Sequence, residues 1–391
     1  MHRVGLVGVG KMGVSHLALA RAHPDLDCVA VCDNQGFVLA GIRAQLGIDT
    51  YKSLDAMIAE ADLDAVIIST PTSSHVTLAR QALEAGLSVF VEKPLTLSAA
   101  DSRELADLAA SRGLANQVGY HNRFIGTFRE TRRLVDAGAI GDVHHIDGRA
   151  FGQVVTKAEG GGRTWRAKKS EGGGCLHDYA CHVIDLMNYV VGAPSEVVGG
   201  RLGQVHSTNV EDSVYAMFGY DNGAIGTLET NWSDESYRKM TTSVTIYGTK
   251  GKIQADRQEC RLYLTPGHTF EKFEAGWTIR YITELQEPVD FYLRGEEYSA
   301  QLDAFAAALS GSADDQAGTF ATAADADWVV EEIARIGGGG PVVRQRADAE
   351  PPSGVHGKEI VATVKRCATQ ASESIKRFAG QVSANYKERR Q

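Results

Sequence analysis

The sequence predicts an α/β protein with two domains, the first built on a parallel sheet and the second on a large open, mostly antiparallel or mixed sheet. Two observations carry this prediction. In residues 1–120, short β-branched runs alternate with segments of helical periodicity, as in βαβ units. After residue 140, long alternating runs follow one another across short turns, which favours neighbouring antiparallel strands.

The first domain is expected to contain five strands joined by crossover helices. The strands are predicted at Val4–Val7, Cys28–Cys32, Ala65–Ser69, Ser88–Val91 and Gln117–Val118. The helices are predicted at Met12–His23, Val38–Leu46, Leu54–Glu60, His75–Ala85 and Ala99–Arg112. Ser53 and Ser98 precede two of these helices, where their hydroxyl oxygens can accept hydrogen bonds from free backbone N–H groups.

The second domain is expected to contain long strands around one central helix, Leu176–Val191. The strands are predicted at Val143–Gln153, Glu196–Val205, Ser213–Tyr220, Ala224–Trp232, Thr241–Tyr247 and Arg261–Thr265. Asp221-Asn222-Gly223 is suited to a tight turn between two of them. A helix with Leu302, Phe305, Ala306 and Leu309 on one face, and another over Thr322–Ile336, should pack on the sheet edges.

Composition narrows the classes of function. The 391 residues are 43% hydrophobic and carry a formal net charge of -9, so a large core can form and no basic surface for nucleic acid is expected. Apolar runs fall far short of the roughly 20 residues of a membrane span, and the N-terminus lacks the pattern of a signal peptide. Six scattered cysteines are typical of reduced thiols. We therefore predict a cytoplasmic protein that binds neither nucleic acid nor membrane.

A glycine-rich turn, Gly8-Val9-Gly10-Lys11-Met12-Gly13, follows the first predicted strand and opens the first helix. In this context the first glycine permits a tight turn, the second admits a diphosphate and the third lets helix and strand approach. Asp33 ends the second strand, where a carboxylate bonds ribose hydroxyls and repels a 2′-phosphate. The pattern predicts a dinucleotide site that prefers NAD over NADP. The alternative is a tight turn followed by an ordinary strand end.

Glu92-Lys93-Pro94 follows a strand at the carboxyl edge of the parallel sheet, which is where ligands bind in open α/β sheets. The ammonium of Lys93 can stabilise an alkoxide as a hydride leaves, and its pKa can fall near a cationic nicotinamide. An exposed surface lysine is the alternative.

The helix expected at Leu176–Val191 carries a polar pair, Asp178 and His182, one turn apart. A carboxylate and an imidazole so spaced can share one substrate hydroxyl, with the histidine as general base. The alternative is a polar pair without a catalytic role. Cys175, His177 and Cys181 nearby are also residue types that bind zinc. Because no CxxC pair is present and hydride transfer to NAD needs only Lys and His, we expect no metal.

These motifs together, with the Gly-Gly-Gly that precedes Asp178-x-x-x-His182-x-x-Asp185, resemble the Gfo/Idh/MocA oxidoreductases over roughly residues 3–340. The resemblance implies an NAD-binding Rossmann domain, at residues 1–122, and a substrate-binding and oligomerisation domain, at residues 123–345. It implies that Lys93, Asp178 and His182 are catalytic. It also implies homo-oligomers, dimers or tetramers, formed through the second sheet.

The resemblance extends to further segments that face the cofactor or the substrate. Residues implied to bind the cofactor, beside the glycine turn and Asp33, are Thr70, Pro71, His75, Glu92, Lys93, Arg123, Trp165 and Arg166. The implied substrate is a sugar, a sugar nucleotide or a polyol, oxidised at a secondary alcohol. Two alternatives stay open: a redox-neutral enzyme that retains NAD for elimination or epimerisation, and a nucleotide-sensing protein without turnover.

Residues 346–391 form a separate region, expected to be a linker and a basic amphipathic helix. From residue 355 onward, eight Lys and Arg stand against three Asp and Glu. Apolar residues recur every three or four positions, at Ile360, Val364, Cys367, Ala371, Ile375, Phe378 and Val382. Such a helix, over about Lys358–Ala384, has one continuous apolar face that needs a partner. A frayed extension is the alternative, because isolated helices are marginal in water.

We predict that this helix docks on the body or on a neighbouring subunit and helps to hold an oligomer. Truncation at Gly354 should then lower the mass of the assembly in light scattering, or lower the melting temperature, because the apolar face loses its contacts. If both quantities equal those of the full chain, the frayed extension is the correct interpretation.

Overall fold

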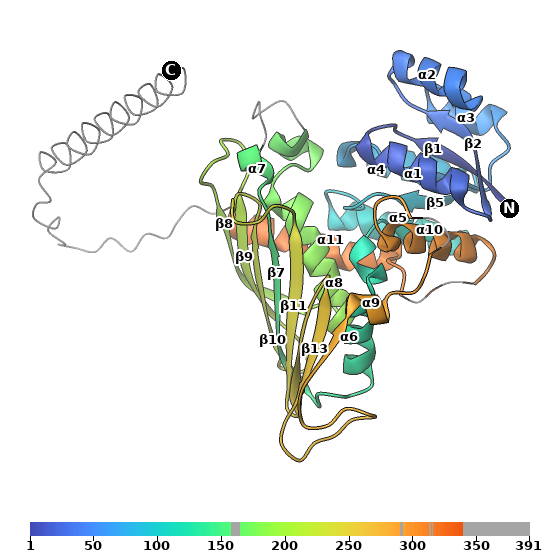
Figure 1. Cartoon of the computed structure of the whole chain (residues 1–391). Coiled ribbons are helices and arrows are strands. Elements are labelled where there is room, and N and C mark those ends of the chain that lie inside the picture. The colour runs from blue at the N-terminus through green and yellow to red at the C-terminus, as the bar shows by residue number, and fades with distance from the viewer. Residues whose placement is uncertain (158–164, 290–291, 313, 315, 339–391) are drawn as a thin grey trace, which may run out of the picture. The chain divides into compact units, whose positions relative to one another are not determined.

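The computed structural model describes residues 1–157, 165–289, 292–312, 314 and 316–338 (Figure 1). The linker and helix predicted within 346–391 lie outside the described residues. So do residues 158–164, the start of the glycine-rich stretch before the helix predicted at Leu176–Val191, and the end of the glycine run 337–340.

The first sheet has six parallel strands in the order β3-β2-β1-β4-β5-β6. The strands are β1 (His2–Val7), β2 (Leu26–Cys32), β3 (Asp49–Tyr51), β4 (Ala65–Ile68), β5 (Ser88–Val91) and β6 (Asn116–Val118). Every residue of β4 and β5 is buried, because helices cover both faces of the sheet. The crossover helices are α1 (Lys11–Ala22), α2 (Gly36–Leu46), α3 (Leu54–Glu60), α4 (His75–Glu84) and α5 (Ala99–Ser111).

The elements predicted for this domain are confirmed, with ends that differ by one or two residues. Both serine caps are confirmed, since Ser53 accepts a hydrogen bond from the Ala56 N–H and Ser98 from the Asp101 N–H. Strand β3 is not among the predicted elements. It is three residues long, Asp49–Tyr51, and none of the three is buried. So short a strand carries no hydrophobic pattern, and its place at the sheet edge depends on pairing with β2.

The second sheet has eight strands in the order β14-β13-β12-β11-β7-β10-β9-β8. They are β7 (Val143–Phe151), β8 (Glu196–Gly203), β9 (Ser213–Gly219), β10 (Ile225–Asn231), β11 (Thr241–Gly248), β12 (Gly251–Asp256), β13 (Glu259–Leu264) and β14 (Gly276–Tyr281). Only the central pair, β7 and β10, is parallel. The predicted fold class is therefore confirmed, with a mixed second sheet. The strands β12 and β14 are additions to the prediction.

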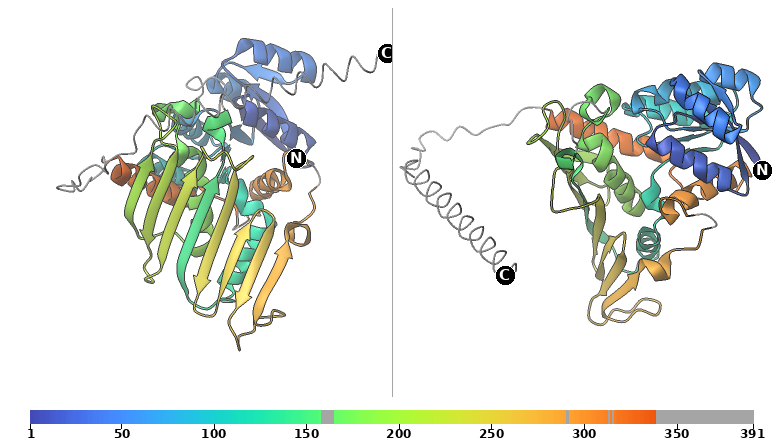
Figure 2. Two further views of the ribbon diagram at one scale, coloured as in Figure 1. Left: turned by 60° about the vertical axis from the view of Figure 1, so that its left-hand side comes forward. Right: turned by 45° about the horizontal axis from the view of Figure 1, so that its top comes forward.

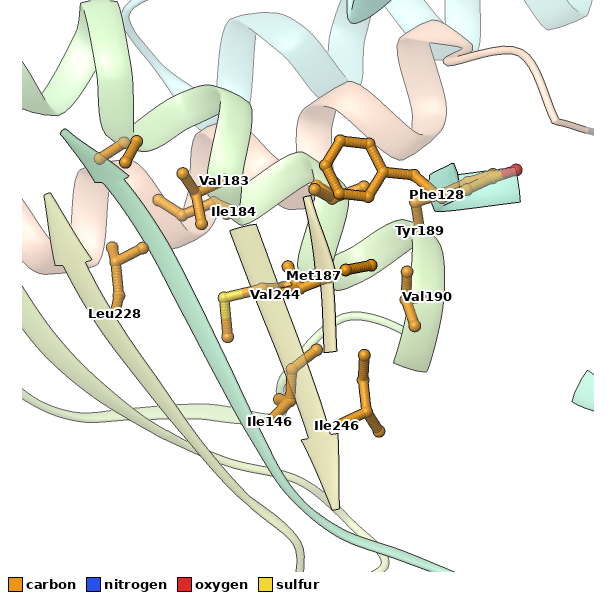
Figure 3. Packing of buried hydrophobic residues seen from close by; sticks show 14 of the residues in the cluster. Phe128, Ile146, Val183, Ile184, Met187, Tyr189, Val190, Leu228, Val244 and Ile246 are labelled. Atoms are coloured by element: carbon orange, nitrogen blue, oxygen red, sulfur yellow. The ribbon is translucent and has the colours of Figure 1, made fainter. Parts of the chain in front are cut away.

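Helices cover one face of the second sheet and leave the other open (Figure 2). The covering helices are α6 (Gly126–Asp136), α8 (Cys181–Val191) and α11 (Phe320–Gly337). Val183, Ile184 and Met187 of α8 face Ile146 of β7 and Val244 of β11 (Figure 3). Each such side chain, fully buried, contributes about 1.5–3 kcal/mol to folding.

Two late helices return to the first sheet. In α10 (Glu296–Leu309), Leu302, Phe305 and Ala306 are buried against the first domain, where Phe305 meets Phe90 of β5 edge to face at 5.8 Å. The predicted apolar face of this helix is confirmed. Helix α11 contacts β8, an edge strand of the second sheet, and β6, an edge strand of the first. None of the helices in the described ranges is long and apolar enough to span a bilayer.

Asp327 of α11 holds the segment that follows β5. One carboxylate oxygen accepts hydrogen bonds from the Thr96 N–H, at 3.2 Å, and from the Ser102 hydroxyl, at 2.6 Å. The other oxygen is buried without a hydrogen-bond partner among the described residues. Burial raises the pKa of Asp327 to about 7, against the lowering effect of these hydrogen bonds. Asp327 therefore ties α11 to the residues just beyond Lys93.

The raised pKa of Asp327 predicts a pH dependence of stability. Since the folded pKa of about 7 exceeds the ordinary 3.8, the folded state holds the proton between these values. Stability therefore falls as pH rises from about 4 through 7. Asp327→Asn keeps an acceptor oxygen without the charge. Above pH 7 its melting temperature should exceed that of the wild type by about 2 °C, a gain that shrinks toward pH 4.

The matched control is Asp325→Asn on the same helix, where the carboxylate is half exposed and pairs with Arg103. This control should show no gain that grows with pH. An Asp327→Asn melting curve with the wild-type pH dependence would contradict the assignment.

Candidate active site

The glycine turn between β1 and α1 has the shape that a diphosphate requires. Gly8 adopts a φ of 89°, which side chains rarely adopt, and a Cβ on Gly13 would overlap the carbonyl oxygen of Gly8. A Cβ on Gly10, by contrast, would meet nothing within 4 Å. The three glycines thus serve the turn, the open approach and the close packing in the order that the sequence predicts.

The start of α1 has the backbone features that favour an anion. Gly10 provides no side-chain cap, and the first turn contains no acidic residue, so the free N–H groups and the helix dipole face outward. Lys11 is exposed there and Met12 is half buried. Asp33 lies beside the turn, where its carboxylate accepts hydrogen bonds from Val9 N–H at 2.7 Å and Gln35 N–H at 2.8 Å. This donor set fits the diphosphate and ribose of a dinucleotide.

Three further predicted residues, Thr70, Pro71 and His75, follow β4. His75 is buried, with one ring nitrogen 3.0 Å from the Thr70 carbonyl and the other 3.0 Å from the Pro94 carbonyl. The neutral ring donates its one N–H to a backbone carbonyl, and its other nitrogen lies against a second carbonyl. The side chain fastens the Thr70–Pro71 segment to the residues after Lys93 and offers no free nitrogen to a ligand. Its part in the site is to position these two segments.

Glu92 is fixed by a histidine that the sequence analysis did not single out. Its Oε1 lies 2.7 Å from Nε2 of His16 on α1. Burial would raise the pKa of Glu92, but the His16 hydrogen bond and the nearby cations outweigh it and lower the pKa. This bond joins the first helix to the end of β5, directly before Lys93.

The predicted helix Leu176–Val191 begins with a π-helical turn, Leu176–Ala180, and continues as α8. The wider turn is a feature often found at functional sites. Glu211 sets its start, since its carboxylate accepts a hydrogen bond from the Leu176 N–H at 2.9 Å. Gly174, at a φ of 109°, makes room for Glu211, because a Cβ there would overlap its carboxylate. No linear motif pointed to Glu211.

Asp178 brings two cations together. Its Oδ1 lies 3.0 Å from Nζ of Lys93, its Oδ2 lies 2.7 Å from Nε of Arg166, and its carbonyl oxygen also accepts from Lys93 at 3.0 Å. Burial would raise the pKa of Asp178, but Lys93 and Arg166 lower it. Burial would lower the pKa of Lys93, but Asp178 raises it. We expected a lowered pKa for Lys93 beside a cationic nicotinamide. The protein groups around Lys93 instead raise its pKa.

His182 lies one turn after Asp178 and is buried, with Nδ1 lacking a hydrogen-bond partner among the described residues. Burial, followed by the charge of Lys93, lowers the pKa of His182 well below its ordinary value. The ring is therefore neutral at physiological pH. His182 and Asp178 do not bond each other in the described structure, so each is directed by its own neighbours.

A stack of rings flanks His182. The ring of His121 lies edge to face with it at 4.8 Å, and Tyr298 of α10 stacks on His121 at 4.9 Å. Burial and nearby cations lower the pKa of His121 to about 3. Neither residue was predicted. His121 lies two residues before Arg123, which the resemblance marks, whereas Tyr298 carries no sequence signal.

Arg123 and Trp165 differ from the other predicted cofactor residues. The Arg123 guanidinium is buried and bonds both carboxylate oxygens of Asp185, at 2.6 to 3.1 Å. The guanidinium is thus occupied by a buried ion pair with Asp185 of α8. In this structure Arg123 holds α8 in place within the second domain. Trp165 lies in a short 3-10 turn, Trp165–Ala167, with the Arg166 guanidinium 4.8 Å above its ring.

The cysteine and histidine residues near α8 do not form a cluster. Cys181 donates a weak hydrogen bond to the His177 carbonyl at 2.9 Å, and Cys175 contacts the Thr230 hydroxyl at 3.4 Å. Within the described ranges, no three His, Cys, Asp or Glu side chains come close enough to hold a metal ion.

A parallel sheet with a glycine turn before its first helix, next to part-buried Lys93 and buried Asp178 and His182, is typical of an oxidoreductase with an NAD-binding Rossmann domain. Residues 2–120 match the oxidoreductase family with an NAD-binding Rossmann fold. Residues 128–254 match the GFO/IDH/MocA C-terminal domain. The chain belongs to the Gfo/Idh/MocA family.

Several known proteins are similar to this chain. The scyllo-inositol 2-dehydrogenase (NAD(+)) of Bacillus subtilis is 29% identical over 297 residues, which cover 73% of this chain and 84% of that protein. The 2,7-anhydro-N-acetylneuraminate hydratase of Escherichia coli is 28% identical, over 66% of this chain and 68% of that protein. A levoglucosan dehydrogenase solved with NADH and levoglucosan has the same fold, with a TM-score of 0.74 at 22% identity, over 86% of this chain and 97% of that one.

Proposed function

We propose that the protein oxidises a secondary alcohol of a sugar, sugar nucleotide or cyclitol to a ketone, with NAD as the hydride acceptor. The observation that carries this proposal is the part-buried contact of Lys93 with Asp178, one turn before a neutral His182, at the carboxyl edge of the sheet that bears the glycine turn. A relative named for inositol oxidation with NAD supports it.

Each residue has a distinct role in the proposed reaction. Bound NAD supplies the hydride acceptor, held by the turn Gly8–Gly13 and by Asp33. His182, whose imidazole is neutral, takes the hydroxyl proton as the general base. Lys93, a cation beside Asp178, stabilises the alkoxide oxygen. Asp178 orients Lys93 and Arg166 and balances their charge.

The first test is a screen of inositols, free sugars and nucleotide sugars for NADH formation, followed by absorbance. Accumulation of NADH with one class identifies the substrate. Conversion without NADH accumulation would instead support the redox-neutral alternative, which the similarity to a hydratase favours. Binding of NADH without conversion of any candidate would support a nucleotide-sensing protein.

We predict that Lys93→Met and His182→Asn lower kcat by about a hundred-fold or more on the substrate found in the screen. Their dissociation constants for NADH should stay within about threefold of the wild type, because both act on proton transfer. The matched controls are Lys252→Met and His145→Asn, which lie on strands of the second sheet. Near-wild-type turnover of either first variant would remove the role assigned to that residue.

Asp33 is predicted to set the preference for NAD. Asp33→Ser removes the charge that repels a 2′-phosphate and also loses part of the bonding to Val9 and Gln35. The ratio of NADP to NAD affinity, measured by calorimetry, should rise about tenfold or more. Equal or tighter binding of NADP by the wild type would show that Asp33 does not select the cofactor.

The open face of the second sheet supports the proposed homo-oligomer. Its strands leave large apolar side chains exposed on the side away from the covering helices. These are Val198, Tyr215, Met217, Ile225, Trp277, Ile279 and Tyr281. Exposed apolar area of this kind marks a contact surface, and a second copy of the chain would cover it.

A further inference from the structure

Arg294 reaches from the segment before α10 to the first helix of the Rossmann domain. Its Nη1 donates a hydrogen bond to the Ser15 hydroxyl at 3.1 Å. Ser15 lies one turn into α1, and its hydroxyl is also 3.1 Å from the carbonyl of Lys11. A residue distant in sequence therefore lies beside the first turns of the helix that the glycine turn opens.

The charge of Arg294 has no carboxylate partner among the described residues. Glu297, a buried carboxylate three residues further along the chain, accepts a hydrogen bond from Arg257 instead. Among the described residues, Ser15 is the one hydrogen-bond partner of the Arg294 guanidinium, which has five N–H donors. The side chain is exposed, so the remaining donors are available to an anion.

Arg294 is also linked to His182 through two aromatic rings. Its guanidinium lies 5.2 Å above the ring of Tyr298, which stacks on His121, which in turn meets His182. Arg294 thus lies between the start of α1 and the histidine that we assign to proton transfer. A dinucleotide with its diphosphate on the glycine turn and its nicotinamide near Lys93 and His182 has to pass between these two places.

We propose that Arg294 binds the diphosphate of the dinucleotide. A guanidinium pairs with phosphate oxygens through parallel, charge-assisted hydrogen bonds, and here it adds a cation from the second half of the chain to the neutral N–H groups of the turn. The inference rests on the NAD binding in the proposed function, but it requires neither a sugar substrate nor turnover.

The test is binding without substrate. NADH fluorescence and calorimetry with ADP-ribose should show about tenfold weaker binding by Arg294→Ala, because a charge-assisted contact is lost. Adenosine, which lacks the diphosphate, should bind both proteins equally. Arg294→Lys should recover part of the affinity, and Ser15→Ala, which keeps the cation, should lose less than Arg294→Ala.

The matched control is Arg103→Ala, which removes an exposed arginine of the first domain that pairs with Asp325. It should bind NADH as the wild type does, with melting curves to verify that every variant is folded. Wild-type affinity of Arg294→Ala for NADH and ADP-ribose would overturn the proposal. So would an equal loss for adenosine, since the effect would then not concern the diphosphate. Failure of the sugar screen would leave these binding results unchanged.

Discussion

The buried carboxylate of Asp178 is the charge on which the site depends. It lies between Lys93, at the end of a strand of the first sheet, and Arg166, in the loop before its own helix. Lys93 is largely removed from water and gains from a charged partner, because transfer of a charge out of water is costly. The ion pair therefore sets the position of the lysine and joins the two sheets at one point.

Other segments of the chain position both members of this ion pair, Lys93 and Asp178. Phe305 of α10 packs on Phe90, which comes shortly before Lys93, and Asp327 of α11 bonds Thr96, which comes shortly after it. On the opposite side, Glu211 and Gly174 fix the start of the π-helical turn that carries Asp178. The geometry of the site is thus determined by segments that contribute no reacting group.

Features that depend on residues close together in sequence could be predicted. Features that depend on contacts between distant residues could not. The glycine turn, Lys93 and the Asp178–His182 helix are local patterns, so they could be found along the chain. Strand β14 was missed although Trp277 and Ile279 alternate with polar residues, so its pattern was available in the sequence. Helix α6 begins at Gly126 after a residue without a side-chain cap, so no start signal is present. His16, Tyr298 and Glu211 act only through partners far away in sequence.

The return of α10 and α11 to the first sheet affects how the chain folds during synthesis. The strands β1 to β6 leave the ribosome long before Leu302, Phe305 and Phe320, which cover apolar surface of that sheet. The central strand β7 likewise has no pairing partners until β10 and β11 have been synthesised. Contacts so distant in sequence form slowly and leave apolar surface exposed in the meantime. The nascent N-terminal half therefore keeps apolar surface uncovered until its last helices emerge, and we expect chaperones to protect it during that time.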